Sequence, residues 1–368
     1  MKKSFQYRLY PTKFQITEMR AILEDCRWLY NHFLGERKNA YEQDKRSISH
    51  YDQLNSIKDI KEHVDFTAYS QTLQNVGTRV DLAYQVFFRR CKSGEKPGYP
   101  RFKSYGRYDS FTYPQSGFEL VKNNIYLSKI GNVKIKLHRP IKGTIKTVVV
   151  KRTPTNKWFI TFSCDNAKPS IKHGKGTIGI DVGLQSFATL SDGSKIENPK
   201  FFKKSEKALA CSQRRLSNTD KHSRLRKSRR LIVSRIHEHI SNRRKDFVYK
   251  ISNNLVKKYK TICVEDLDVN RMGENKKFSK SIHDVAWAIF FQVLAHKAEE
   301  AGGQVIPVNP AYTSQDCSKC GTRILKSLDE RIHRCSCGLV LDRDHNAALN
   351  ILAMGLHGLV VKPRSPQL

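Results

Sequence analysis

Gly179-Ile180-Asp181-Val182-Gly183 is the segment on which the fold depends, and the alternating run Phe187-Ala188-Thr189-Leu190 follows it. This pattern predicts two strands, over residues 177–182 and 186–190, with Asp181 near the centre of the first. A glycine in a strand marks a place where another backbone or a ligand comes close. We therefore expect Gly179 and Gly183 to allow a substrate to approach Asp181.

Two further carboxylates stand at comparable positions. Glu265 ends the apolar run Thr261-Ile262-Cys263-Val264, and Asp344 lies in Asp342-Arg343-Asp344-His345-Asn346-Ala347-Ala348, which opens a helical pattern. The expected elements follow the order of an RNase H-like fold: a strand with Asp, a hairpin, helices, a strand that ends in Glu, a helix, a strand, and a helix with Asp. We therefore predict that Asp181, Glu265 and Asp344 converge.

Neighbouring acids are alternatives for two of the three positions. Glu265 is favoured over Asp266 because it continues the alternation of the apolar residues before it. Spacing alone leaves the choice between Asp344 and Asp342 open. A coincidental order of three structural carboxylates is the remaining interpretation.

Three converging carboxylates predict a site for divalent metal ions. Hard cations such as Mg²⁺ prefer oxygen ligands. Two such ions about 3.5–4 Å apart can hold both the attacking and the leaving oxygen of a phosphodiester. We therefore expect two Mg²⁺ ions and hydrolysis by a metal-activated water. We identify no Ser/His/Asp arrangement or Walker-type loop that competes for this role.

The composition indicates a polyanionic partner. The 368 residues include 67 Lys and Arg against 34 Asp and Glu, a net charge of +33. Such an excess favours a polyanionic partner over a merely solvated surface, and charge alone does not separate DNA, RNA and an anionic membrane. We find no apolar run long enough to span a bilayer and no apolar signal region at the start.

Four of the nine cysteines form two pairs with metal-ligand spacing. Fourteen residues separate the pair Cys317 and Cys320 from the pair Cys335 and Cys337, which suits one tetrahedral, structural Zn²⁺ in a ribbon. The Cys-x-Cys pair is tighter than Cys-x-x-Cys, so His333 is a spare ligand candidate. This pattern fits a reducing compartment better than a disulfide framework.

The N-terminal half begins with one strand and helical patterns and continues with short strands. Residues 3–10 alternate as a strand, and Thr12 to Gln15 has the form of a capping box before an amphipathic helix. More helix is expected over residues 50–90. Short strands separated by turns follow from residue 110 to residue 162 and predict a small antiparallel barrel or sandwich. If the strand at 3–10 joins it, the helices are an insertion.

A dense basic stretch between residues 203 and 245 predicts a helical arm. A helix over about residues 224–258 would be ~50 Å long. Such an arm either lies in solvent or contacts the phosphates of a nucleic-acid backbone, and the net charge favours contact with phosphates. The candidate contacts on it are Arg226, Lys227, Arg229 and Arg230.

Aromatic and basic residues interleave over residues 101–113, beginning with Arg101-Phe102-Lys103. This spacing serves base stacking with phosphate contact, and it equally describes a strand with one apolar face. Both interpretations stay open. Trp28, Trp158 and Trp287 are expected to be core anchors.

The chain resembles the TnpB family, the insertion-sequence-encoded ancestors of the type V CRISPR effectors. The resemblance rests on the three acidic segments above and on four others: Tyr7-Arg8-Leu9-Tyr10-Pro11-Thr12, Pro100-Arg101-Phe102-Lys103, Ser110-Phe111-Thr112-Tyr113-Pro114-Gln115, and Thr313-Ser314-Gln315-Asp316-Cys317, which opens the zinc ribbon. It covers nearly the whole length. It favours Asp344, two residues before Asn346, as the third catalytic acid.

The resemblance implies a multidomain α+β protein. The implied parts are a β-barrel wedge domain (residues 1–10 and 91–170), an inserted helical recognition domain (11–90), and an RNase H-like α/β nuclease domain of the RuvC type (171–310 and 341–354). The basic arm covers about 200–258, a zinc ribbon 311–340 and a C-terminal tail 355–368.

The resemblance also implies an RNA-guided endonuclease. A transposon-derived guide RNA would direct it to double-stranded DNA beside a short flanking motif, in the prokaryotic cytoplasm at the nucleoid. The flanking motif would be read in the helical insertion, near Tyr51, Ser56, Ser70 and Gln74. The alternatives are a guided repressor that does not cut and a transposase that joins DNA strands. The three retained carboxylates argue against the repressor.

Overall fold

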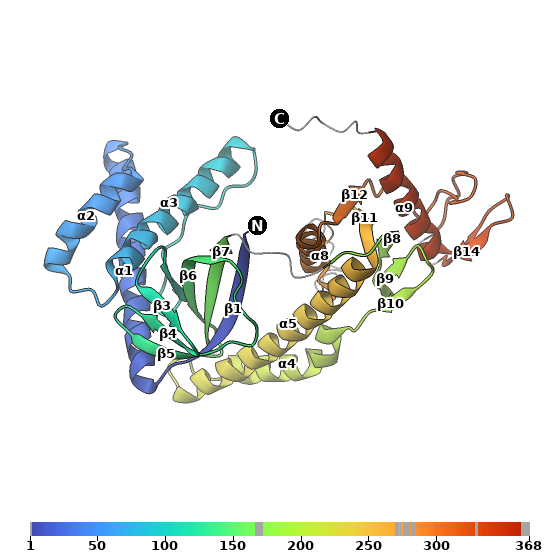
Figure 1. Cartoon of the computed structure of the whole chain (residues 1–368). Coiled ribbons are helices and arrows are strands. Elements are labelled where there is room, and N and C mark those ends of the chain that lie inside the picture. The colour runs from blue at the N-terminus through green and yellow to red at the C-terminus, as the bar shows by residue number, and fades with distance from the viewer. Residues whose placement is uncertain are drawn as a thin grey trace. The chain divides into compact units, whose positions relative to one another are not determined.

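The structure is a computed structural model that describes residues 2–165, 172–268, 272, 274, 280, 284–327 and 330–361. It divides into two compact units, residues 1–168 and 169–368, coloured blue to green and green to red in Figure 1. The sequence also predicts a linker over residues 167–176, and part of that segment lies outside the described residues. No described helix is both long and apolar enough to cross a bilayer.

The first unit combines helices with an antiparallel sheet. Its elements are β1 (Lys3–Tyr10), α1 (Lys13–Asp44), α2 (His50–His63), α3 (Ser70–Lys92), β2 (Ser110–Tyr113), β3 (Phe118–Val121), β4 (Asn124–Leu127), β5 (Gly131–Lys136), β6 (Thr144–Arg152) and β7 (Trp158–Asp165). The strand order is β2-β6-β7-β1-β5-β4-β3, a nearly closed barrel. Strand β1 lies between β7 and β5, so the helices are inserted between strands of one sheet.

One hydrophobic core joins these helices to the barrel. Thr12 caps α1 with the predicted capping box, in which its side chain accepts from the Gln15 backbone and the Gln15 side chain accepts in return. The helix then buries Met19, Leu23 and Phe33 in the same cluster as the barrel strands. The structure therefore confirms both predictions for this unit, the alternating strand over residues 3–10 and the amphipathic helix that follows the capping box.

The second unit is built on a mixed five-stranded sheet. Its elements are β8 (Gly176–Val182), β9 (Ser186–Leu190), β10 (Lys195–Glu197), α4 (Phe201–Ser217), α5 (Arg224–Lys258), β11 (Tyr259–Glu265), α8 (Trp287–Ala301), β12 (Gln304–Val308), β13 (Ile332–Arg334), β14 (Val340–Asp342) and α9 (Arg343–Val361). The strand order is β10-β9-β8-β11-β12, with β11 parallel to both its neighbours. This is the expected RNase H-like arrangement.

Helix α9 crosses strand β8 at Gly179. A Cβ atom built on Gly179 would lie 2.2 Å from the Ala348 carbonyl oxygen, and one on Gly355 would lie 2.3 Å from the Cys263 sulfur. The glycines therefore let the helix pack on β8 and β11. Our expectation that Gly179 makes room for a substrate is wrong, because a helix backbone occupies that space.

Three local expectations also need correction. The sequence predicts a helix over residues 284–301 that ends at Gly302-Gly303. Helix α8 begins instead at Trp287, because Ala286 takes a left-handed φ of 61°. Helix α9 runs to Val361, beyond the start of the expected tail. Trp158 and Trp287 are buried, but Trp28 is 39% exposed and stacks on His32, so it is no core anchor.

Candidate functional site

Asp181 and Glu265 lie on neighbouring parallel strands. The register pairs Ile180 of β8 with Val264 of β11. Asp181 and Glu265 are the next residues on these two strands, so they occupy adjoining positions on neighbouring strands. The Asp181 side chain is held inside the sheet, with a residue exposure of 9%. Glu265 is half-buried at the end of β11, whereas its neighbour Asp266 is exposed. The structure therefore separates these two neighbours as the alternation suggested.

Asp344 stands in the first turn of α9, above the end of β8. Its Oδ2 atom lies 4.0 Å from the position of a Cβ built on Gly183. Asp342 has a different task, because its Oδ1 accepts from the backbone N–H groups of Asp344 and His345 and its Oδ2 pairs with Lys195 at 2.7 Å. Asp342 thus caps the helix, and Asp344 is left beside Asp181.

The three acids form what we call the carboxylate cluster, defined as Asp181, Glu265 and Asp344. The pKa of Asp181 is raised well above its usual value, first by burial and then by the negative charges of Glu265 and Asp344, while Arg343 opposes the shift. Two like charges beside a buried carboxyl are costly unless a cation compensates them. The donor set of this cluster therefore fits divalent metal ions.

Glu265 is held by Thr313, which the sequence singled out only as the first residue of a segment shared with the TnpB family. Thr313 Oγ1 donates to Glu265 Oε1 over 2.6 Å. Burial raises the pKa of Glu265, and this hydrogen bond opposes the increase. Thr313 lies near the start of the zinc ribbon, 48 residues after Glu265. No spacing pattern in the chain connects the two residues.

The four cysteines gather as a metal-ligand group. The Sγ atoms of Cys317, Cys320, Cys335 and Cys337 all lie within 4.8 Å of one another. Tetrahedral zinc with bonds of about 2.3 Å requires sulfur separations of roughly 3.8 Å. The measured separations of 3.7 Å (Cys317–Cys337) and 3.5 Å (Cys320–Cys335) are compatible with zinc. Among the described residues this is the one group gathered so tightly; the carboxylate cluster is spaced more widely.

His333 is not part of the cysteine group. It is fully buried, and its Nδ1 atom contacts the Lys326 ammonium. Burial and the Lys326 charge lower the pKa of His333. The tight Cys-x-Cys pair therefore reaches the other two sulfurs without help from the histidine.

The zinc ribbon is tied to α9 next to Asp344. Asn346 Nδ2 donates to the Asp316 carbonyl over 2.8 Å, and Asn346 Oδ1 accepts from the Ser318 N–H over 3.0 Å. One turn later, Asn350 Nδ2 donates to the carbonyls of Thr313 and Asp316. The two asparagines therefore bind residues 313–318, the segment that contains Cys317, to the helix that carries Asp344.

The four candidate residues of the basic arm divide into two pairs. Arg226 donates to the carbonyls of Leu216 and Thr219, and Arg229 donates to Arg215, so both close the turn between α4 and α5. Lys227 and Arg230 point their side chains to solvent. Only the second pair is left as an exposed cationic surface, a difference that composition could not reveal.

The candidate residues of the helical insertion lie on α2 and α3. Tyr51 is 75% exposed, and Gln74 is also exposed. Ser70 Oγ accepts from Lys61 Nζ over 2.7 Å, and Ser56 Oγ donates back to the Gln53 carbonyl. Tyr51 and Gln74 are therefore the members best placed to contact a partner.

The aromatic and basic stretch contains two different structures. Only Ser110–Tyr113 forms a strand, and its Phe111 and Tyr113 are buried. Before it, Asn31 of α1 holds Lys103 through both backbone groups, at 2.7 and 2.9 Å. Arg101 and the ring of Phe102 are exposed. The strand interpretation is therefore confirmed for Ser110–Tyr113 alone, and contact of Arg101 and Phe102 with nucleic acid stays a prediction.

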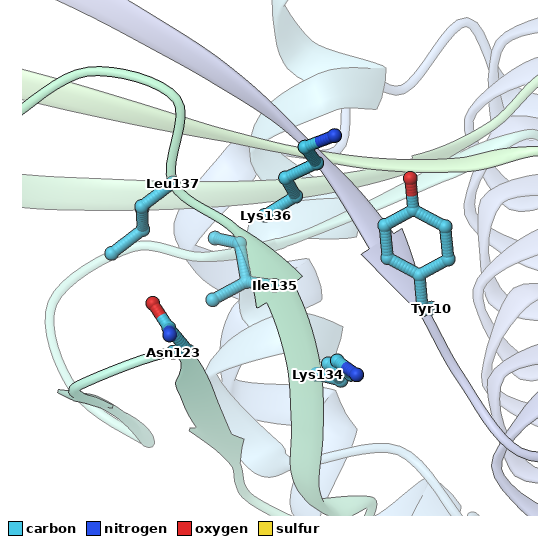
Figure 2. A pocket seen from close by; sticks show the side chains of 6 residues that line it. All are labelled: Tyr10, Asn123, Lys134, Ile135, Lys136 and Leu137. Atoms are coloured by element: carbon cyan, nitrogen blue, oxygen red, sulfur yellow. The ribbon is translucent and has the colours of Figure 1, made fainter.

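A further cationic surface covers the outside of the barrel. Arg8 of β1 lies opposite Lys136 of β5 and Phe159 of β7, with its guanidinium 5.2 Å from the Phe159 ring centre. A cavity of about 440 Å³ opens beside it, and its six lining residues include Tyr10, Lys134 and Lys136 but no acid (Figure 2). The sequence analysis missed this surface, which the alternation of lysines in residues 131–136 could have indicated.

Comparisons with known proteins match several segments. A family model described as "Probable transposase" matches residues 159–276, one for the TNB domain of Cas12f1-like proteins matches residues 287–351, and one for a helix-turn-helix domain matches residues 1–46. Cas12f1, in a cryo-EM structure of its complex with sgRNA and target DNA, aligns with a TM-score of 0.61 at 15% identity. That alignment covers 95% of this chain and 98% of Cas12f1. At this identity the likeness shows the fold.

Two relatives align along almost the entire chain. A protein of Streptomyces pristinaespiralis, provisionally named an RNA-guided DNA endonuclease, is 32% identical over 97% of this chain and 90% of its own length. InsQ of Escherichia coli strain K12, with the same provisional name, is 32% identical over 96% and 92%. With this identity over this length, the chain belongs to the TnpB family of RNA-guided DNA endonucleases.

Proposed function

We propose that this chain is a transposon-encoded RNA-guided endonuclease that hydrolyses phosphodiesters of double-stranded DNA at Asp181, Glu265 and Asp344. The observation that carries the proposal is the placement of these three acids, which come from three distant parts of the sequence. Asp181 and Glu265 follow the paired residues Ile180 and Val264 on neighbouring parallel strands, and Asp344 Oδ2 lies 4.0 Å from the position of a Cβ built on Gly183. The names of the full-length relatives support the guide and the target. The fold shared with Cas12f1, solved with guide and target, supports the same function.

We propose two Mg²⁺ ions at the carboxylate cluster and one structural Zn²⁺ at the four cysteines. Bound magnesium would supply an activated water and neutralise charge on the leaving 3′ oxygen. Asp181 contributes the central ligand, buried in the sheet. Glu265 is oriented by Thr313, and Asp344 is presented by a helix whose first turn Asp342 caps. The residues thus supply fixed positions for charge, which is the main requirement of phosphodiester chemistry.

The exposed cations supply the proposed nucleic-acid surfaces. Lys227 and Arg230 of the arm and the outer barrel surface around Arg8 would contact phosphates of a guide RNA transcribed from the transposon end, and of its DNA hybrid. Guide pairing would supply sequence specificity. Tyr51 and Gln74 would contact the flanking motif. Chromosomal targets would place the protein at the nucleoid.

Plasmid cleavage tests the proposal directly. The protein is expressed with its flanking DNA, the co-purifying RNA is sequenced, and a matching target is placed beside a randomised flank. With Mg²⁺ we expect linear plasmid from a subset of flanks. Asp181→Ala and Glu265→Ala should retain the RNA without cutting. Intact plasmid from guide-loaded wild-type protein would instead favour a repressor, and joined strand-transfer products a transposase.

A further inference from the structure

Thr313 makes its shortest polar contact with a carboxylate of the cluster. Its Oγ1 lies 2.6 Å from Glu265 Oε1 and 3.2 Å from the Pro310 carbonyl oxygen. A hydroxyl has one proton to donate, and a hydrogen bond to an ionised carboxylate is shorter and stronger than one to a neutral carbonyl. With a residue exposure of 3%, Thr313 meets little competition from water for this bond.

The backbone of Thr313 is fixed from a second direction. Asn350 of α9 donates to its carbonyl over 2.8 Å and to that of Asp316 over 2.7 Å. Asn346, which is fully buried, donates to the same Asp316 carbonyl. The threonine hydroxyl therefore has little freedom to follow Glu265 if the carboxylate rotates away.

The same segment continues into the cysteine group. Cys317 lies four residues after Thr313, and its backbone N–H and carbonyl bond to Thr322 and Gly321. Thr313 is thus the point where the ribbon, the helix bearing Asp344 and the strand bearing Glu265 meet. The sequence separation of 48 residues between Thr313 and Glu265 is bridged by one hydrogen bond.

We infer that Thr313 is a positioning residue that orients the Glu265 carboxylate for divalent metal binding, an inference that rests on the proposed function. A glutamate side chain has three rotatable bonds, and a half-buried position alone does not select one orientation. A fixed donor on one carboxylate oxygen selects it in advance. Partners that orient metal ligands in this way typically contribute about 10–100-fold in metal affinity or activity.

Three variants separate positioning from a merely structural role. Thr313→Val removes the hydroxyl and keeps the shape, Thr313→Ser keeps the hydroxyl, and Thr147→Val is the matched control. Thr147 Oγ1 donates to the Pro114 carbonyl over 3.3 Å in the first unit, so the control removes a comparable threonine–carbonyl bond away from any carboxylate of the cluster.

The readouts are Mn²⁺ affinity of the guide-bound protein by calorimetry, the Mg²⁺ concentration for half-maximal cleavage, zinc content and melting temperature. We expect Thr313→Val to weaken Mn²⁺ affinity and raise the half-maximal Mg²⁺ concentration by about 10-fold or more, with zinc content unchanged. Thr313→Ser should stay within about 2-fold of wild type, and Thr147→Val should match wild type in metal affinity. Unchanged Mn²⁺ affinity in Thr313→Val would overturn the inference, as would a serine variant as defective as the valine variant.

A double-mutant cycle with Glu265→Gln keeps the test valid if the valine variant is less stable. Because Thr313 acts through Glu265, Thr313→Val should cause no further loss of Mn²⁺ affinity in the Glu265→Gln background. An additive loss would contradict the inference. If Glu265→Gln by itself left both Mn²⁺ affinity and cleavage intact, the proposed function would fail; if only Thr313→Val were silent, the inference alone would fail.

Discussion

The backbone of Ala348 in helix α9 lies against Gly179 of strand β8 so closely that a Cβ on the glycine would come within 2.2 Å of the Ala348 carbonyl oxygen. Asp181 follows Gly179 by two residues on the strand. Asp344 precedes Ala348 by about one helical turn. This helix–strand contact therefore sets how near the two carboxylates stand, although neither acid takes part in it.

We predict that Gly179→Ala destabilises the second unit and moves Asp344 away from Asp181. Forcing a methyl group against a backbone carbonyl should cost on the order of 3 kcal/mol, because a backbone cannot yield as a flexible side chain can. Thermal melting should show the destabilisation, and cleavage should fall even at temperatures where the variant is folded.

Gly358→Ala on the same helix is the matched control. A Cβ there meets nothing within 4 Å. Alanine in an exposed helix should raise stability by about 0.4–1 kcal/mol. Equal melting temperatures of the two alanine variants would contradict the packing argument.

Asp181→Asn should abolish cleavage and, in metal-free buffer, raise the melting temperature. The pKa of Asp181 is raised in the folded state, so the folded protein binds a proton more tightly than the unfolded chain does. Its contribution to stability is present below the ordinary pKa of 3.8 and is lost as the pH rises through the folded-state pKa. Asparagine removes this loss.

A melting series across pH without metal checks the expectation. The advantage of Asp181→Asn should grow as the pH rises above the ordinary carboxyl range and level off above the folded-state pKa. It should shrink when Mg²⁺ is added, because the cation compensates the charge in wild type only. A variant that melts below wild type at neutral pH would show that burial and like charge do not govern this residue.

Asp344→Asn and Asp342→Asn should behave oppositely. Asparagine caps a helix about as well as aspartate, so Asp342→Asn should retain folding and most cleavage despite losing the Lys195 ion pair. Asp344→Asn should fold normally and lose cleavage. Burial raises the pKa of Asp342, but Lys195 and the two backbone N–H groups outweigh it and lower the pKa overall. Cleavage by Asp344→Asn would exclude Asp344 as a metal ligand.

Zinc removal should reduce stability before it affects chemistry. Cys317→Ser should lower the zinc content and the melting temperature, because metal binding to such a group contributes directly to folding. The exposed Cys211, outside the cysteine group, supplies the control Cys211→Ser. His333→Gln should keep full zinc content, and a loss of zinc there would make the histidine a ligand.

The two pairs on the arm should separate binding from folding. Replacing Lys227 and Arg230 with alanine should leave the melting temperature unchanged. The slope of the logarithm of the RNA-binding constant against the logarithm of the salt concentration should become less steep by about 0.7–0.9 for each phosphate that is no longer neutralised. Replacing Arg226 and Arg229 should lower stability by about 1–3 kcal/mol, because their charged hydrogen bonds to the carbonyls at the end of α4 are removed. The reverse pattern would assign the phosphate contacts to the second pair.

Local pattern was sufficient for most elements. Residues 3–10, the capping box at Thr12 and the long helix at 224–258 depend on neighbours in sequence, so alternation, caps and helical spacing predicted them. The start of α8 was missed because Ala286 adopts a left-handed conformation that no residue type there announces.

Residue types, alternation and spacing were sufficient to predict an RNase H-like order of elements, the exposure that separates Glu265 from Asp266 and the gathering of the four cysteines. The roles of these residues as metal ligands stay predictions. The Asp342 cap on α9 is a local contact over two and three residues, so the N-cap preference of aspartate could have separated Asp342 from Asp344 in the sequence. Two relationships became visible only in the folded chain: Gly179 makes room for a helix, and Thr313 reaches Glu265. Both join segments that lie far apart in the sequence and that only folding brings together, so no local pattern of residues could have indicated them.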